Sequence, residues 1–222
     1  ALSDAEIASA HHVLARLARR GPRRLSRRTR SSRRRGDRDD LRATIRASLR
    51  YGGEPVERRF RRATLRQRPV VLVCDVSGSM EPYARALVLF LQAAVATGRH
   101  VEAFTFGTRL TRLTPYLDGR DPERALDRAA RAVPDWAGGT RIGEALRSFN
   151  DRHGRRGMAR DAVVVICSDG WERGDAALLG RELERLARLA YRVVWVNPRV
   201  AAAGFVPSTG GMAAALPFVD EL

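Results

Sequence analysis

The stretch Val70–Met80, which reads VVLVCDVSGSM, decides the fold. It begins with apolar, mostly β-branched residues of strand length and ends in the polar motif Asp75-x-Ser77-x-Ser79. An apolar run without polar alternation is typical of a strand buried on both faces of an open α/β sheet. Ligand sites in such sheets lie beyond the carboxyl ends of the strands. The sequence therefore predicts a ligand site at these three polar side chains.

The chemistry of this motif favours a hard cation. One carboxylate and two hydroxyls stand at alternating positions of a turn, and Gly78 leaves its backbone free to bend. Mg²⁺ and Mn²⁺ prefer oxygen ligands in near-octahedral geometry and keep several waters. The oxygens of this motif do not fill such a shell, so we expect further ligands from elsewhere in the chain.

Two later segments offer those ligands. Thr140 lies on a glycine-rich loop just before a helical pattern. The apolar run Val163–Cys167 ends in Ser168-Asp169-Gly170, which repeats the arrangement of a buried strand followed by an acid and a glycine. An alternative interpretation is that all these residues are turn and capping residues without a metal.

Together the three segments resemble the complete metal-ion-dependent adhesion site of a von Willebrand factor A (VWA) domain. The resemblance implies a doubly wound, Rossmann-like α/β fold, with a mostly parallel central sheet and helices on both faces. It also implies a bound Mg²⁺, or Mn²⁺ or Ca²⁺, with one coordination position left for an Asp or Glu of a partner protein. The implied ligands are Asp75, Ser77, Ser79, Thr140 and Asp169.

The wider pattern is similar to the CoxE-like VWA proteins of bacteria over residues 36–222. The segments that carry this resemblance are 40–49 (DLRATIRASL), 52–55 (GGEP), 73–80 (VCDVSGSM), 138–143 (GGTRIG), 168–171 (SDGW) and 194–198 (VWVNP). The family implies a MoxR-type AAA+ ATPase as partner and a client metalloenzyme such as carbon monoxide dehydrogenase. By resemblance the chain is a non-catalytic cytoplasmic adaptor whose metal site binds an acidic residue of a partner.

The charge of the chain is concentrated at its N-terminal end. The net charge is +16, and every basic residue other than histidine is an arginine. Residues 1–69 hold 21 arginines against 7 acids, whereas residues 70–222 hold 20 against 18. We expect an Arg-rich helical or disordered extension at 1–36, a helix and an extended linker at 37–69, and the VWA domain at 70–222.

The block Arg23–Arg35 contains mainly Arg and Ser and is expected to be disordered or loosely extended. It is either an electrostatic tail for an acidic partner, nucleic acid or a phosphate-bearing ligand, or a solubilising linker. The alternative function is therefore a nucleic-acid- or phosphate-binding protein that uses this block. No interleaved aromatics or reading helix support it, so nucleic acid is the less favoured partner.

The remaining patterns predict further elements. His11 and His12 lie on the first expected helix and are interpreted as surface or packing residues rather than ligands. An Arg-rich edge segment is expected at 56–65, and a missing last helix is expected because the chain ends where it would begin. The expected helices are 3–20, 39–51, 82–97, 122–133, 142–153, 176–190 and 211–215, and the expected strands after the first are 101–106, 110–113, 162–167, 192–196 and 216–219.

Four residues beside the motifs are candidates for partner binding: Trp171, Met80, Tyr83 and Arg141. A tryptophan beside an open metal position suits an interface anchor, although packing of Trp171 on its own helix is an alternative. Cys74 and Cys167 are expected to be buried, reduced core residues that lie near each other if their strands are neighbours.

The sequence does not favour catalysis. Phosphoryl-transferring aspartate enzymes carry a second acid two residues after the first, and Ser77 stands there. The chain has no P-loop, nucleophile elbow, His-Glu-x-x-His or Cys-x-x-Cys motif. No apolar run approaches the length of a membrane span and no signal-peptide pattern opens the chain, so a soluble cytoplasmic protein is expected.

Overall fold

The computed structural model describes residues 23–96, 100–119, 121–133, 139–198 and 210–222. The helix expected at 3–20, with His11 and His12, lies outside the described residues. The described chain forms two compact units, which we call the arginine-rich unit (residues 23–68) and the sheet unit (residues 69–222).

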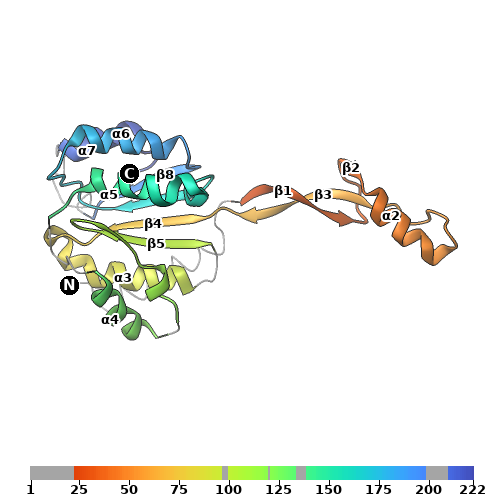
Figure 1. Cartoon of the computed structure of the whole chain (residues 1–222), viewed down its shortest axis with the longest axis horizontal. Coiled ribbons are helices and arrows are strands. Elements are labelled where there is room, and N and C mark those ends of the chain that lie inside the picture. Colours follow the sequence, from red (N-terminus) through yellow and green to blue (C-terminus); the bar gives the residue numbers. More distant parts are fainter. Residues whose placement is uncertain (1–22, 97–99, 120, 134–138, 199–209) are drawn as a thin grey trace. The chain divides into compact units, whose positions relative to one another are not determined.

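The sheet unit is built on five strands in the order β6-β5-β4-β7-β8 (Figure 1). Neighbouring strands are parallel except β5 and β6, which are antiparallel. The doubly wound α/β architecture expected from the sequence is confirmed. The strands are β4 (Val70–Asp75), β5 (Val101–Phe106), β6 (Leu110–Arg112), β7 (Val163–Cys167) and β8 (Arg192–Val196).

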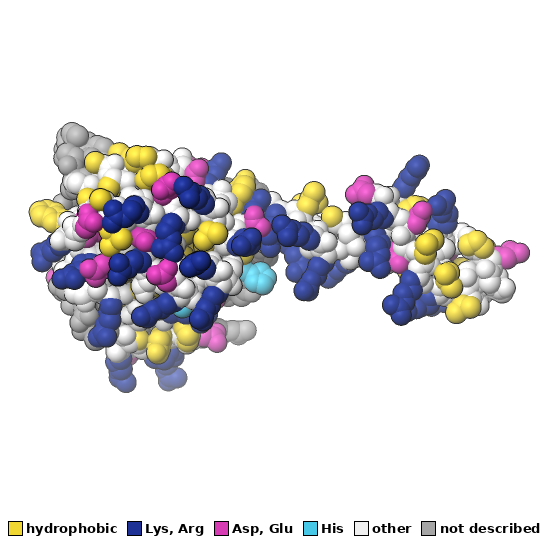
Figure 2. Space-filling model, turned by 45° about the horizontal axis from the view of Figure 1, so that its top comes forward, with side chains coloured by type: hydrophobic (Ala, Val, Ile, Leu, Met, Phe, Trp, Pro, Cys, Tyr) yellow, Lys and Arg dark blue, Asp and Glu magenta, His cyan; other side chains and the backbone are white. Residues whose placement is uncertain are grey.

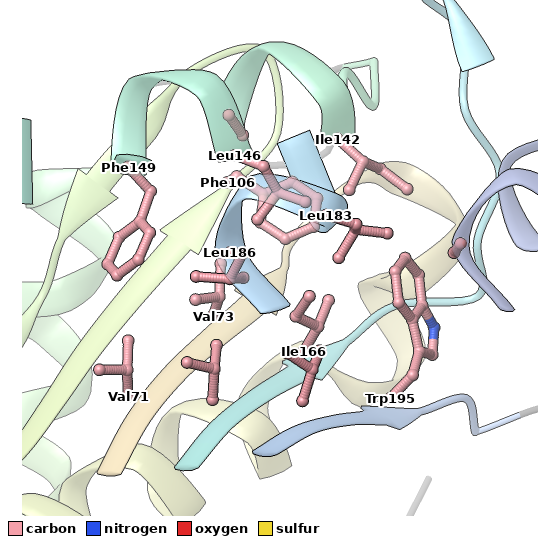
Figure 3. Packing of buried hydrophobic residues seen from close by; sticks show 14 of the residues in the cluster. Val71, Val73, Phe106, Ile142, Leu146, Phe149, Ile166, Leu183, Leu186 and Trp195 are labelled. Atoms are coloured by element: carbon pink, nitrogen blue, oxygen red, sulfur yellow. The ribbon is translucent and has the colours of Figure 1, made fainter. Parts of the chain in front are cut away.

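Alternate residues of the central strand β4 enter two separate cores, because successive side chains of a strand point to opposite faces. Val71 and Val73 belong to the cluster formed with α5, α6 and α7, which is shown in Figure 3. Leu72 and Cys74 belong to the cluster formed with α3 and α4 on the other face. The helices are α3 (Glu81–Ala96), α4 (Pro122–Ala132), α5 (Ile142–Phe149), α6 (Ala176–Ala187) and α7 (Gly210–Ala215).

Two parts of the sheet unit differ from expectation. Helix α5 continues as the π-helical segment η4 (Asn150–Met158), beyond the expected end at His153. The strand expected at 216–219 is wrong: Leu216–Phe218 is a 3₁₀ turn, and pairing with β8 is limited to one bridge between Val194 and Glu221. Pro217 explains this difference, because proline has no N–H to donate to a strand ladder.

The arginine-rich unit consists of a three-stranded antiparallel sheet, in the order β1-β3-β2, and one short helix (Figure 1). Its strands are β1 (Arg23–Ser32), β2 (Arg38–Asp39) and β3 (Phe60–Gln67). The expectation that residues 23–35 are disordered or loosely extended is wrong, since β1 pairs with β3 from Arg23 to Ser32 around a bulge. The expectation of an edge segment is also wrong, because β3 is the central strand of this sheet.

The helix of this unit, α2 (Leu41–Ser48), agrees with the sequence pattern. Asp40 caps it by accepting a hydrogen bond from the Ala43 N–H at 3.2 Å. It continues as one 3₁₀ turn and ends at Gly52, whose φ of 65° is a left-handed conformation that suits glycine. Figure 2 shows basic side chains over this unit, with apolar side chains exposed between them.

Candidate metal centre

The expected site lies where the strand order of the sheet reverses. From β4 the chain continues to β5 on one side, while β7 pairs with the other side of β4. This reversal opens a crevice at the carboxyl ends of the two central strands, which is the usual ligand position in open α/β sheets. Asp75 is the last residue of β4, and Asp169 follows β7 by two residues.

The carboxylate of Asp75 joins the first and third loops of the site. It is fully buried, its Oδ1 accepts the Ser77 N–H at 2.8 Å, and its Oδ2 accepts the Ser168 hydroxyl at 2.7 Å. Burial raises the pKa of Asp75, and the nearby charge of Asp169 raises it further, while the hydrogen bonds from Ser77 and Ser168 act in the opposite direction. A nearby positive charge favours the ionised carboxylate and so opposes both effects that raise the pKa. The position therefore suits a cation.

The two serines of the first loop lie side by side. Ser77 is buried and Ser79 is exposed, and their hydroxyl oxygens are 3.2 Å apart. The short 3₁₀ turn η2 (Gly78–Met80) brings them to one side of the chain before α3 begins. Both hydroxyls are therefore available to one ligand.

Thr140 comes from a different loop and lies against the third. It is buried, and its carbonyl oxygen accepts the Arg173 N–H at 3.1 Å. The next residue, Arg141, donates its N–H to the Gly107 carbonyl at 3.2 Å, which fixes the loop against the end of β5. The three loops line one cavity of about 270 Å³. Its lining residues are Ser77, Gly78, Ser79, Gly139, Thr140, Trp171 and Arg173.

Asp169 supplies the observation that best tests the site for a metal. Its Oδ1 accepts the Trp171 N–H at 3.1 Å. Its Oδ2 is buried and has no hydrogen-bond partner within the described part of the chain. A buried carboxylate oxygen without a partner is costly, and most such atoms in proteins are satisfied by a proton donor, water or an ion.

The donor set also matches the kind of ion expected. The described residues contain no group of three or more His, Cys, Asp or Glu side chains that could hold a metal. The oxygens at the site instead come from the carboxylates Asp75 and Asp169 and the hydroxyls of Ser77, Ser79 and Thr140. Such all-oxygen sites favour Mg²⁺, Mn²⁺ or Ca²⁺ over metals that prefer nitrogen or sulfur ligands.

The four partner-binding candidates fall in different places. Trp171 lies on the loop before α6, is 54% exposed and lines the cavity, so it does not pack on a helix of its own. Arg141 is exposed and forms an ion pair with Glu144 at 3.3 Å. Tyr83 is half-buried on α3 and does not line the cavity. Met80 is 1% exposed, and this burial in the core removes it from the partner-binding candidates.

Three residues that build the site have no role assigned from the sequence, although they lie in or next to the third motif. Ser168 orients Asp75, and Arg173 lines the cavity opposite Gly139. Glu172 accepts the Gly143 N–H at 2.8 Å and so ties the third loop to the start of α5. Ser168 and Glu172 flank Asp169 within three residues, but the partners of their side chains depend on tertiary structure.

The two cysteines are neighbours behind the site. Cys74 and Cys167 occupy paired positions on β4 and β7, and both are buried free thiols. Their mutual hydrogen bond, burial and the charge of Asp75 raise the pKa of Cys74 well above its ordinary value. The thiol of Cys74 is therefore protonated at neutral pH.

Comparison with protein families gives a direct assignment. The profile described as "VWA domain containing CoxE-like protein" matches residues 10–222. The chain belongs to this family. The resemblance to CoxE-like VWA proteins in the sequence is thereby confirmed, and a comparison with curated protein sequences gives no significant match.

Solved structures that resemble the CoxE-like chain include two kinds of protein. The proximal thread matrix protein 1 from the mussel byssus matches with a TM-score of 0.48 and 16% identity over 70% of this chain and 44% of its own, and one structure of it has a zinc-occupied MIDAS motif. An aerotolerance-related membrane protein from Bacteroides fragilis matches with a TM-score of 0.34 and 17% identity over 65% of this chain and 78% of its own. The CoxE-like chain thus spans less than half the length of the mussel protein. Within the described residues of the CoxE-like chain, no helix is long and apolar enough to cross a membrane.

Proposed function

We propose that Asp75, Ser77, Ser79, Thr140 and Asp169 hold one divalent cation, Mg²⁺ or alternatively Mn²⁺ or Ca²⁺. The observation that carries this proposal is the buried, unpartnered Oδ2 of Asp169 at a site whose cavity is lined by three hydroxyl-bearing residues. When bound, the ion supplies a coordination position for an oxygen of another molecule. Ser168 acts indirectly, by holding Asp75 in place through its hydroxyl.

The ligand we propose for that position is an Asp or Glu side chain of a partner protein. VWA domains mediate protein–protein interactions, and the family is in general non-enzymatic. The rim of the cavity supports a protein ligand, because Trp171 offers an exposed aromatic surface and Arg173 a guanidinium near Gly139. Aromatic and arginine side chains are the residues most often found at the energetic centre of interfaces.

Within its family, we propose that the chain is a non-catalytic adaptor for a MoxR-type AAA+ ATPase. Its client is a metalloenzyme such as carbon monoxide dehydrogenase, whose maturation the pair assists. The proposal rests on family membership for the identity of the partners and on the oxygen-lined cavity for the mode of binding.

The test is capture of a purified MoxR-type ATPase from the same genome by the immobilised chain, in Mg²⁺ and in EDTA. We expect capture in Mg²⁺, loss of capture in EDTA, and loss in the Asp169→Ala variant. A matched control is Asp118→Asn, because Asp118 is an exposed acid outside the cavity lining. Equal capture in EDTA and in Mg²⁺ contradicts the proposal that a metal bridges the two proteins.

The alternative function is binding of nucleic acid or phosphate, and only the positive charge of the arginine-rich unit supports it. Residues 23–68 hold 18 arginines against 5 acids. Their exposed apolar side chains are mostly aliphatic, whereas proteins that bind single strands stack bases on aromatic rings. DNA binding that weakens steeply with salt and ignores EDTA supports this alternative.

A further inference from the structure

Helix α2 of the arginine-rich unit packs through its polar face. The Thr44 hydroxyl accepts the Arg59 N–H at 2.9 Å and donates to the Asp40 carbonyl at 3.0 Å. Ser48 is buried and donates to the Ile45 carbonyl at 2.8 Å. The contact side of this helix therefore consists of small and hydroxyl-bearing residues, the reverse of the usual arrangement for a helix on a globular protein.

The apolar face of the same helix points into solvent. Leu41, Ile45 and Leu49 are 70%, 63% and 73% exposed. Leu41 and Ile45 lie on α2, and Leu49 begins the 3₁₀ turn that continues it. Their spacing of four residues places them in one row, which is about 12 Å long at 1.5 Å per residue. We call this row the α2 stripe. An ordered row of exposed aliphatic side chains bordered by polar residues marks an interaction surface.

The unit itself offers nothing apolar to cover the α2 stripe. Across residues 23–68, all of which the structure describes, the only buried residues are Asp40 and Ser48. Two further aliphatic residues, Leu25 and Leu65, face each other in the β1–β3 ladder and are also exposed. The α2 stripe is thus not the outer part of a core.

A row of arginines runs beside the α2 stripe. Arg42, Arg46 and Arg50 each follow one of its apolar residues, and all three are exposed. None of them forms an ion pair within the described chain, and three acids of the unit pair with other arginines instead. These pairs are Asp39 with Arg58 at 3.1 Å, Glu57 with Arg59 at 2.7 Å and Asp40 with Arg61 at 3.7 Å.

We propose that the α2 stripe is a docking surface for an amphipathic segment of a partner protein that presents aliphatic side chains bordered by carboxylates. The aliphatic row requires an apolar counterpart, and the arginine row requires negative charge beside it. This surface belongs to the arginine-rich unit, so the inference does not depend on the metal proposed for the sheet unit.

Other occupants fit these observations less well. Residues 1–22 hold only two acids, Asp4 and Glu6, against three arginines, and a second copy brings the same surplus of arginines. Nucleic acid supplies the charge but no aliphatic surface. An anionic membrane supplies both, but binding to a membrane surface scales with the apolar area that the helix buries, and α2 has only eight residues and neither tryptophan nor phenylalanine beside its leucine and isoleucine.

Fluorescence anisotropy of the full chain with a synthetic probe tests the proposal. The probe is a labelled helical peptide with Leu at every fourth position of one row and Glu on both sides, measured in EDTA. We expect binding to the probe, and a loss of affinity of about tenfold or more in the triple variant Leu41→Ser, Ile45→Ser, Leu49→Ser, because three aliphatic contacts are removed. The triple variant Arg42→Gln, Arg46→Gln, Arg50→Gln should bind more weakly and with less dependence on salt.

A matched control carries Leu25→Ser and Leu65→Ser, which remove exposed aliphatic side chains from the same unit without touching α2. This control is expected to bind like the parent chain. An equal loss in the control overturns the proposal, as does equal binding of a peptide with Lys in place of Glu. A preference for a DNA duplex or for phosphatidylserine vesicles that disappears in the Leu/Ile variant assigns the α2 stripe to another class of partner and also overturns it.

Labelling of an Ile45→Cys variant with a maleimide provides an independent readout. The two native cysteines are buried and are expected to react slowly. The new thiol should react rapidly in the free chain and be protected by the Glu-bearing probe. Protection in the free chain means that the chain covers the α2 stripe itself, and this result contradicts the proposal.

Discussion

The two units of the chain are stabilised by different interactions. The sheet unit buries large apolar side chains completely, among them Phe104, Leu146 and Trp195. The arginine-rich unit buries only Asp40 and Ser48, and it is held by a β ladder, a helix cap and ion pairs. The packed core of the sheet unit can hold a site rigidly. The arginine-rich unit has no such core, so its apolar side chains remain available to a partner.

The largest expected effect is the loss of a core aromatic in the sheet unit. Phe104 is fully buried and makes an edge-to-face contact with Phe149 at 5.2 Å between ring centroids. We expect Phe104→Ala to lower the free energy of unfolding by about 3–5 kcal/mol, because it removes apolar burial and leaves a cavity. Urea unfolding followed by tryptophan fluorescence measures this, since Trp171 and Trp195 lie in the sheet unit.

The matching change in the arginine-rich unit is Ile45→Ala. Because Ile45 is exposed, we expect a change within about 0.5 kcal/mol, as for other surface substitutions. Hydrogen exchange of the α2 amides reports on this unit, which has no tryptophan. Similar destabilisation by the two substitutions would remove the contrast between the units.

Metal binding is expected to act on the sheet unit alone. A ligand that binds only the folded state at 100 times its dissociation constant adds about 2.7 kcal/mol to the free energy of unfolding. Mg²⁺ at that level should therefore stabilise the sheet unit of the parent chain and of the Asp118→Asn control, but not of Asp75→Asn. The measurement is urea unfolding with and without Mg²⁺. Stabilisation of Asp75→Asn by the same amount would exclude Asp75 as a ligand.

In the arginine-rich unit, the largest effect should come from a polar residue. Asp40 caps α2 and lies 3.7 Å from Arg61, and it is one of the two buried residues of the unit. Asp40→Ala should cost about 1 kcal/mol through loss of the cap. Faster hydrogen exchange in residues 41–51, with unchanged exchange in the sheet unit, is the expected result. Unchanged exchange in 41–51 would show that the cap contributes little.

A small effect is also expected from the pH dependence of the sheet unit. His153 lies 5.0 Å from Phe104 between ring centroids, and burial, followed by the charges of Arg112 and Arg152, lowers its pKa. The unfolded chain therefore binds a proton first, and stability falls as the pH drops below about 6.5, the ordinary value for histidine. His153→Gln should flatten the pH dependence of unfolding between pH 7 and 5. A slope that is unchanged in this variant assigns the effect to other groups.

The sequence predicted the sheet unit better than the arginine-rich unit for a physical reason. Strands covered by helices carry mostly apolar residues, so β5 and β8 begin and end where the pattern places them, at 101–106 and 192–196. Strand β1 has no such pattern. It forms because its backbone pairs with β3, about 35 residues later in the chain, and side-chain periodicity does not report that pairing.

The candidate site shows the same limit. The motif residues lie at strand ends and on tight loops, so their convergence follows from the order of the strands. The position of Met80 after the motif predicts a place on the partner surface, but the turn η2 directs this side chain into the core. The contributions of Glu172 and Arg173 come from contacts with Gly143 and Thr140 on another loop, and no local pattern encodes them.

The most direct test of the central claim is an anomalous difference map from a crystal of the chain soaked in Mn²⁺. We predict one strong peak within coordination distance of oxygens from Asp75, Thr140 and Asp169, contributed by three separate loops. The same soak of an Asp75→Asn crystal should lose the peak. A parent crystal whose only peaks lie elsewhere, or that shows none, would contradict the account.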